Sequence, residues 1–306
     1  MKRRYYSYNQ YLREKFGCRV HKLSLDAGFS CPNFDGSLSR TGCIFCNNRA
    51  FSPFSREPGL SLEDQIIRSM SFSKKRFKAK KFIAYFQSFS STYADPAELK
   101  KKYDVIRKFK DIVGLAISTR PDCIDKAKLD LIGGYAQDYR VYLEYGLQTM
   151  HDRTLQKINR NHSFVDFTRA VEMTAKRKNI HTSAHVIIGL PGEGEKEIKE
   201  TASAVAGLPL WGIKFHCLHA VKDTVLADMY DRGEVSLLSE DEYIDLLIQF
   251  LEIIPEQWVI LRLVSDADRD CLIAPQWVNQ KQRILQKIEK ELETRDTRQG
   301  KYSPKS

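Results

Sequence analysis

Three cysteines near the amino end have the spacing of a metal or cluster site. Cys31 and Cys43 have eleven residues between them, and Cys43 and Cys46 have two. The surrounding segment is rich in glycine and contains a proline. This composition is typical of an open loop that can wrap around a ligand. Because thiolates bind both zinc and iron–sulfur clusters, the spacing predicts one of these two centres.

The number of ligands separates the two centres. Structural zinc takes four protein ligands, commonly as two paired arms, whereas this segment has one pair and one single cysteine. Three cysteines without a clear fourth ligand favour a 4Fe–4S cluster with one iron open, which in radical enzymes binds S-adenosylmethionine (SAM) through its amino and carboxylate groups. Zinc remains the alternative, with Cys18, His21 or Cys217 as the fourth ligand.

Length, composition and charge exclude several classes of protein. The 306 residues are 42% hydrophobic and 29% charged, which is typical of a globular protein. The sequence has no run of about 18 apolar residues, and no apolar stretch follows its basic start, so we expect neither a membrane-spanning helix nor a secretory signal. An odd number of cysteines, seven, favours a cytoplasmic metal or cluster protein over a disulfide framework.

Apolar, β-branched segments alternate six times with helical segments. The expected strands are Lys22–Asp26, Lys81–Phe86, Val113–Ser118, Arg140–Tyr145, His181–Ile188 and Gly212–Leu218. The expected helices are Ser61–Phe72, Pro96–Phe109, Asp125–Tyr135, His151–Asn159, Phe164–Arg177 and Glu195–Leu208. This alternation predicts parallel strands joined by crossover helices, and strands that are apolar throughout are typical of a sheet covered on both faces.

The pattern changes after Leu218. The later elements expected are a helix over Asp241–Ile254, a strand over Trp258–Val264 and a charged helix over Val278–Leu292. We therefore expect residues 1–235 to form a core with a basic N-terminal segment, and residues 236–292 to form an α/β extension packed on that core. Residues 293–306 lack periodicity, so we expect a disordered tail there.

The cysteine loop, its place after the first strand and the sixfold alternation resemble the radical SAM superfamily. The flanks of the cysteines, Gly-Phe-Ser-Cys-Pro-Asn and Gly-Cys-Ile-Phe-Cys-Asn, are similar to the YhcC/YtqA group. This group is related to the Elongator catalytic subunit, and its Gram-positive branch includes the tRNA-modifying MnmL proteins. The resemblance spans roughly residues 5–280. Further matching segments, in the same order along the chain, are 86–93, 118–122, 144–149, 188–193 and 214–230.

The resemblance implies a partial (β/α)6 TIM-like barrel with the cluster loop after the first strand. It also implies that Cys31, Cys43 and Cys46 hold a 4Fe–4S cluster that binds SAM. In such barrels the chemistry takes place at the C-terminal ends of the strands. The matching segments fall at predicted strand ends, so we expect them to converge on one mouth.

Side chains that follow the second and third strands are candidate SAM ligands. Gln87 and Ser88 occupy the place where the superfamily contacts the SAM amino group, although this chain lacks the usual Gly-Gly-Glu-like segment. A polar turn that ends the strand is the alternative for them. Arg120 follows the third strand and is a candidate partner of the SAM carboxylate, or else braces its own loop through Asp122.

The fourth strand ends in two polar residues, Glu144 and Gln148, that flank Gly146. A carboxylate in an apolar run is costly unless it has a partner. Hydrogen bonds to the SAM ribose would satisfy one of the two residues. A structural contact between Glu144 and Arg120 or Lys214 is the alternative.

The fifth and sixth strands contribute the remaining candidates. The small residues around Gly189 let a flat adenine approach the backbone, and they also suit a tight turn that caps a helix. Lys214 and His216 lie on the sixth strand as candidate cofactor contacts, with His219 and Lys222 just beyond it. Histidines are more often satisfied within a core, which is the alternative for His216 and His219.

The distribution of basic residues suggests a polyanionic partner. The sequence has 49 Lys and Arg against 39 Asp and Glu, a net charge of +10. Basic runs occur at residues 2–4, 74–81, 100–102, 107–110 and 176–178, and Tyr5, Tyr6, Tyr8 and Tyr11 interleave with the first. Positive charge with aromatic residues is typical of single-stranded RNA binding, whereas a solvated basic surface is the alternative.

Together, these features and the resemblance imply a cytoplasmic radical SAM enzyme that modifies tRNA. The expected electron donor is of the flavodoxin or ferredoxin type, and no membrane partner is expected. The resemblance to MnmL narrows the reaction to wobble uridine, where a 5-carboxymethylaminomethyl side chain becomes 5-aminomethyl. Two other functions remain open: a radical SAM enzyme that acts on a small metabolite, and a non-catalytic, zinc-stabilised RNA-binding protein.

Overall fold

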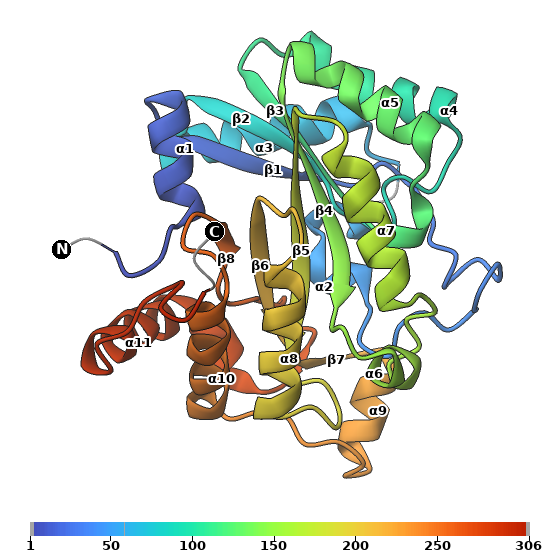
Figure 1. Ribbon diagram of the computed structural model, residues 1–306. Helices are drawn as coiled ribbons and strands as arrows, with labels where there is room; N and C mark the ends of the chain where they lie inside the picture. The colour runs from blue at the N-terminus through green and yellow to red at the C-terminus, as the bar shows by residue number, and fades with distance from the viewer. Residues whose placement is uncertain (1–2, 58, 304–306) are drawn as a thin grey trace.

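The computed structural model describes residues 3–57 and 59–303, and a curled sheet of seven parallel strands lies at its centre (Figure 1). In sheet order the strands are β1 (Val20–Leu25), β2 (Lys81–Phe86), β3 (Ile112–Thr119), β4 (Arg140–Gln148), β5 (Ile180–Ile188), β6 (Gly212–Cys217) and β8 (Val259–Arg262). Every neighbouring pair is parallel. The sheet curls into a half-barrel, which confirms the predicted α/β fold.

Crossover helices join successive strands and cover the outer face of the sheet (Figure 1). They are α3 (Leu62–Phe77), α4 (Pro96–Tyr103), α5 (Lys126–Gly134), α6 (Asp152–Lys157), α7 (Phe164–Ala175) and α8 (Glu195–Ala206). Local sequence fixes where they begin, since the side chain of Ser61 caps α3 and that of Asp95 caps α4. The helix expected over Pro96–Phe109 changes after Tyr103 into a 3-10 turn over Asp104–Lys108.

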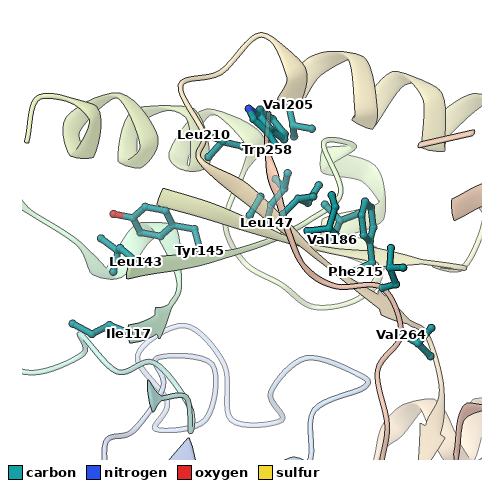
Figure 2. Close-up of a cluster of buried hydrophobic side chains, with 14 of the residues drawn as sticks. Ile117, Leu143, Tyr145, Leu147, Val186, Val205, Leu210, Phe215, Trp258 and Val264 are labelled. Carbon is teal, nitrogen blue, oxygen red and sulfur yellow. The ribbon is translucent and has the colours of Figure 1, made fainter. Parts of the chain in front are cut away.

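The outer face of the sheet and these helices form the main hydrophobic core, part of which is shown in Figure 2. Leu143, Tyr145 and Leu147 of β4 are fully buried in it, and Val186 of β5 is in register with Phe215 of β6. Because side chains alternate along a strand, the residues between them face the barrel interior. Each strand therefore contributes side chains to the hydrophobic core on one face and to the barrel interior on the other.

A helix that the sequence analysis did not predict, α1 (Tyr8–Phe16), closes the N-terminal end of the barrel. The ring of Tyr11 lies 4.8 Å from that of Trp211 and 6.5 Å from that of Tyr142, between ring centres. Tyr5 and Tyr11 are each 8% exposed. The RNA-stacking role suggested by the sequence is therefore wrong for these two tyrosines, because their rings already fill the protein interior.

The C-terminal part adds both helices and strands. Its elements are α9 (Val225–Asp231), α10 (Glu240–Ile253), α11 (Lys281–Thr294) and an antiparallel pair formed by β7 (Ala220–Val221) and β9 (Leu272–Ala274). β8 pairs with β6, so this part continues the barrel sheet in addition to packing on it. A short helix, α2 (Asn48–Phe51), follows the cysteines. No helix in the described residues is long and apolar enough to cross a membrane.

The residues after α11 differ from the disordered tail that the sequence analysis expected. Gln299 is 2% exposed, and its side-chain Nε2 donates to the carbonyls of Pro255 at 2.7 Å and Trp258 at 2.9 Å. The hydroxyl of Thr297 donates to Glu252. Polar side chains hold this segment, and hydrophobic periodicity does not report such contacts. Residues 304–306 of the expected tail lie outside the described residues.

The contacts of α1 predict a measurable contribution to stability. Replacing Tyr11 with alanine should lower the free energy of unfolding by about 3 kcal/mol, because a buried ring leaves a cavity among its aromatic neighbours. Urea denaturation measures the change. Tyr302→Ala is the control, since that ring is 63% exposed and should cost about 0.5 kcal/mol or less. An equal effect of the two substitutions would contradict the role of α1 as a closing element.

Candidate active site

A cavity lies at the C-terminal ends of the strands, and the cysteine loop that follows β1 forms one of its walls. Its lining includes most of the residues singled out in the sequence: Cys31, Cys43, Cys46, Gln87, Arg120, Gln148, Lys214 and His216. The loops after β1, β2 and β3 and the strands β4 and β6 thus contribute to one site. The expected convergence on a single mouth is therefore present for these eight residues.

The three thiols lie in one largely buried wall of the cavity. Cys31 and Cys43 are 7% and 5% exposed, and Cys46 is partly buried. Burial raises the pKa of Cys31 and of Cys46, and the neighbouring thiols raise both pKa values further. Thiolates in such a wall require a bound cation to hold their charge. Among the described residues, no group of three His, Cys, Asp or Glu side chains is arranged to hold a metal ion.

The residues considered as a fourth zinc ligand do not complete a zinc site. Cys18 precedes β1 and therefore lies at the end of the strands opposite the cavity. The ring of His21 stacks on that of Phe77, with 4.5 Å between ring centres. Cys217 lines the cavity, but its thiol donates to the carbonyl of Leu218 at 3.2 Å, and burial raises its pKa.

The segment between α6 and α7 clamps the cysteine loop, and the sequence analysis missed it. The amide of Asn33 donates to the Asn159 carbonyl at 2.6 Å, and the amide of Asn159 donates back to the Gly42 carbonyl at 2.6 Å. Asn159 and Asn161 have φ angles of 53° and 52°, a left-handed conformation that asparagine tolerates better than most residues. Two asparagines around one arginine, residues 159–161, are the sequence signal for this clamp.

This clamp directs Arg160 against the cysteines. Its Nη1 lies 3.5 Å from the sulfur of Cys43, and its Nη2 donates to the Gly146 carbonyl at 3.0 Å. A Cβ at Gly146 would lie only 2.6 Å from this Nη2, so a larger residue would have to displace the guanidinium. The charge of Arg160 lowers the pKa of Cys31 and Cys46, opposing burial, and therefore favours the thiolate forms.

Arg120 is 2% exposed and has two kinds of contact. Its guanidinium binds both carboxylate oxygens of Asp122, at 2.9 and 2.8 Å, and donates to the carbonyl of Asn161 at 3.1 Å. The bracing contact considered in the sequence analysis is therefore present. Its Nη1, however, has no partner among the described residues, and the side chain lines the cavity. Arg120 thus has one buried donor available to a ligand.

Glu144 lies beneath the cavity wall and is fully buried. Its carboxylate accepts from Lys22, from Lys214 at 3.2 Å and from the His185 ring nitrogen Nε2 at 2.8 Å. Lys214 also donates to the hydroxyl of Tyr85 at 2.7 Å. Burial raises the pKa of Glu144, but the charges of Lys214 and Lys22 outweigh it and hold the pKa well below its usual value. The contact with Lys214 was the structural alternative considered for this residue.

We call the charged groups around Glu144 the floor of the cavity, and β6 and β8 form its other side. Arg262 contacts the ring of His216 with its Nη2 at 3.1 Å or less, and its Nε donates to the Phe215 carbonyl at 3.4 Å. Burial lowers the pKa of Lys214 to about 7, and burial together with the charge of Arg262 lowers the pKa of His216 well below its usual value. His216 is therefore neutral near pH 7, while Arg262 carries charge into the cavity.

The remaining candidates from the sequence occupy different positions. Gln148 lines the cavity at a bulge in β4 and has a φ of 78°, which is unusual outside glycine and is often found at functional sites. Gln87 lines the cavity as well. Ser88 is buried behind the wall, with its hydroxyl 3.0 Å from that of Ser52. Gly189 has a φ of 94° and is packed against Leu238, also behind the wall.

Three of the basic runs lie at the opposite end of the barrel from this cavity. Residues 74–81 lead into β2, residues 107–110 into β3 and residues 176–178 into β5, so all three runs border the N-terminal ends of the strands. Several of their charges are paired on the surface, for example Lys74 with Asp111 at 2.9 Å. Lys2 of the first run lies outside the described residues.

Comparison with known proteins assigns this architecture to a class. The family model of the radical SAM superfamily matches residues 39–205, and that of the radical SAM C-terminal domain matches residues 210–294. The chain therefore belongs to the radical SAM superfamily, whose enzymes bind a 4Fe–4S cluster and SAM. The trio Cys31, Cys43 and Cys46 in one cavity wall fits such a cluster.

Individual relatives identify the group within the superfamily to which the chain belongs. YtqA of Bacillus subtilis is 38% identical over 300 residues, 98% of this chain and 93% of that protein. YhcC of Escherichia coli is 37% identical over 267 residues, 87% of this chain and 85% of that protein. These matches place the chain in the YhcC/YtqA group of the superfamily.

More distant relatives share part of the sequence or the fold. A tRNA uridine(34) acetyltransferase of Methanocaldococcus infernus is 29% identical over 152 residues, 48% of this chain and 27% of that protein. The solved structure of the Elp3 protein of the same archaeon, with an N-terminal deletion, has a TM-score of 0.64 at 18% identity. The match covers 92% of this chain and 64% of the solved chain, and it shows a shared fold.

The cysteine trio predicts a specific loss of iron. Serine at Cys31, Cys43 or Cys46 should each remove most of the bound iron and sulfide, because an alkoxide is a poorer ligand of these soft metal ions than a thiolate. Iron content after anaerobic reconstitution measures the effect. Cys18→Ser is the matched control and should retain wild-type iron, since Cys18 lies at the far end of β1. Full iron content in all three site variants would contradict the assignment of these cysteines as cluster ligands.

Two buried histidines predict lability to acid. Burial lowers the pKa of His162 to about 2 and that of His185 to about 3. Below the ordinary pKa of about 6.5 the unfolded chain binds protons at both rings while the folded chain does not, so stability falls as the pH drops from about 6.5 toward about 3. Each histidine contributes up to about 1.4 kcal/mol per pH unit.

Urea denaturation at several pH values tests this dependence. His162→Phe removes one titrating ring of similar size, so its unfolding free energy should fall less steeply with acid than that of the wild type. The structural reason is that neither ring nitrogen of His162 has a partner in the described part of the chain. Identical slopes for the two proteins would contradict the buried, neutral state of this ring.

Proposed function

We propose that this radical SAM enzyme modifies tRNA at the wobble uridine and converts a 5-carboxymethylaminomethyl side chain to 5-aminomethyl. The observation that carries the proposal is the cavity itself, in which a cysteine trio faces a cationic floor at the mouth of an Elp3-like half-barrel. The partial sequence similarity to a tRNA uridine(34) acetyltransferase supports a uridine at this position as the target.

Cavity residues suit the binding and orientation of SAM. When bound, the cluster and SAM supply reductive cleavage of the sulfonium and a 5′-deoxyadenosyl radical. The free Nη1 of Arg120 is a donor for the SAM carboxylate, and the amides of Gln87 and Gln148 are donors and acceptors for its amino and ribose groups. In this proposal Ser88 and Gly189 act through the backbone they pack, and Glu144 acts by orienting Lys214.

The cysteine loop also suits contact with a reducing partner. Arg40 and Arg49 flank the cysteines and are exposed. An electron donor of the flavodoxin or ferredoxin type is acidic, so these arginines would favour its approach close to the cluster loop. The donor would thereby dock at the rim of the cavity.

One observation favours a small-metabolite substrate instead of tRNA. The longest basic run, residues 74–81, lies at the end of the barrel away from the cavity. An RNA bound to this run would have to extend along the whole barrel to place a base at the cavity. A small substrate would need no such surface.

Nucleoside analysis of tRNA discriminates between these functions. A strain that lacks the gene should accumulate 5-carboxymethylaminomethyluridine and lose 5-aminomethyluridine, as measured by mass spectrometry of digested tRNA. The wild-type gene should restore the profile, while the Cys43→Ser gene should not, because that variant lacks a cluster ligand. An unchanged nucleoside profile in the deletion strain would overturn the tRNA assignment and leave the small-metabolite function.

A further inference from the structure

The floor of the cavity carries more positive than negative charge. Lys214 and Arg262 line the cavity, and Lys22 reaches the same cluster from β1, whereas Glu144 is the only acidic side chain of the described residues that pairs with any of them within 4.0 Å. His185 and His216 add no charge near pH 7, because burial lowers the pKa of both rings. Asp266 lies on the cavity rim and raises the pKa of Arg262 from a distance, but forms no ion pair with it.

Arg262 is the cation whose charge is least neutralised. Its polar contacts in the described structure are the neutral ring of His216 and the carbonyl of Phe215, and its Nη1 has no contact of this kind. Burial lowers its pKa, which means that the site disfavours the charge that arginine nevertheless keeps. A guanidinium without an acidic partner in a cavity wall is stabilised when an anion binds there.

Lys214 supplies a second donor next to it on β6. The ammonium has three N–H groups, of which one donates to the Tyr85 hydroxyl and one to Glu144. In the charged form the third N–H remains for a ligand. Burial lowers the pKa of Lys214 to about 7, and an anion bound beside it favours the charged form. The side chain lines the same cavity as Arg262. The register of the sheet places Lys214 directly opposite Arg262. A planar guanidinium beside an ammonium matches the two oxygens of a carboxylate.

We propose that Arg262 and Lys214 form a subsite for the carboxylate of the substrate. The subsite rests on the proposed function, in which the carboxylate is that of the 5-carboxymethylaminomethyl side chain. The carboxylate of SAM would have a different place, because SAM would bind beside the cysteine trio, where Arg120 and Arg160 lie. Arg262 lies on β8, at the edge of the sheet farthest in order from β1 and its cysteine loop.

The subsite has a consequence for selectivity. The substrate carries the carboxylate and the 5-aminomethyl product does not, so the same two cations bind the substrate more tightly than the product. The positive charge of the product's amino group is repelled by the cationic floor. The loss of the carboxylate in the reaction thus favours both the choice of substrate and the release of product.

Binding of modified RNA by the holoenzyme tests the subsite. The probes are three anticodon stem-loop RNAs that carry 5-carboxymethylaminomethyluridine, its methyl ester or 5-aminomethyluridine. The reconstituted protein with SAM should bind the acid about tenfold to about a hundredfold more tightly than the ester, since hydrogen bonds to an ionised group are lost in the ester. Arg262→Gln should bring the affinity for the acid close to that for the ester. Arg262→Lys, which keeps the charge, should retain part of the preference.

Arg269→Gln is the matched control, because it removes the same charge from an exposed position of the same C-terminal part. This variant should keep the preference for the acid. Equal binding of acid and ester by the wild type, or an equal preference in the wild type and Arg262→Gln, would overturn the subsite. The nucleoside profile of the deletion strain judges the proposed function separately. A changed profile with equal binding of acid and ester overturns the subsite alone, and an unchanged profile with no binding of any probe overturns both.

Discussion

The neutralisation of Glu144 is the interaction on which the interior of this barrel depends. Its carboxylate lies at the centre of β4 and is reached by Lys22 from β1, Lys214 from β6 and His185 from β5. Backbone hydrogen bonds join only neighbouring strands, whereas the contacts of Lys22 and Lys214 with Glu144 join strands that are separated in the sheet. They therefore favour the curled form over a flat sheet. Removing one partner would leave a buried charge unpaired, which typically costs about 3–5 kcal/mol.

The alternation of side chains along β4 divides the interior into levels. Tyr142 belongs to the aromatic base that α1 closes, Glu144 to the charged floor, and Gly146 to the level of the cysteines, where it admits Arg160. The bulge that follows Gly146 shifts the register, and it turns Gln148 into the cavity. A single strand thus sets the order of apolar base, polar floor and reactive mouth, because each second residue points inward.

The sequence predicted those parts of the molecule that have a local signal. The six apolar strands were found within a few residues of their ends, since a strand buried on both faces is apolar along its whole length. The cysteine trio was found from its spacing. By contrast, α1 has few apolar residues and gains its burial from Trp211 and Tyr142, far away in the chain. Such tertiary packing overrides local patterns.

The same reason explains what was missed at the site. Arg160 contacts the sulfur of Cys43 and the carbonyl of Gly146. Its placement depends on an asparagine clamp that joins segments more than a hundred residues apart. Glu144 was recognised as a costly carboxylate, but its partners Lys22 and His185 were not, because they come from strands with no distinctive polar pattern. Pairing between distant strands becomes visible only when the register of the sheet is known.

The three arginines of the cavity show how charge is distributed over the site. Arg120 is largely neutralised by Asp122 and keeps one free donor, while Arg160 is placed against a thiol that becomes a thiolate when it binds iron. Arg262 has neither an acid nor a thiol beside it in the described structure. Since each guanidinium stays charged, the first two are balanced by the protein and the cluster, and the third is balanced only by what enters the cavity. An anionic substrate therefore completes the electrostatics of this site in a way that a neutral one does not.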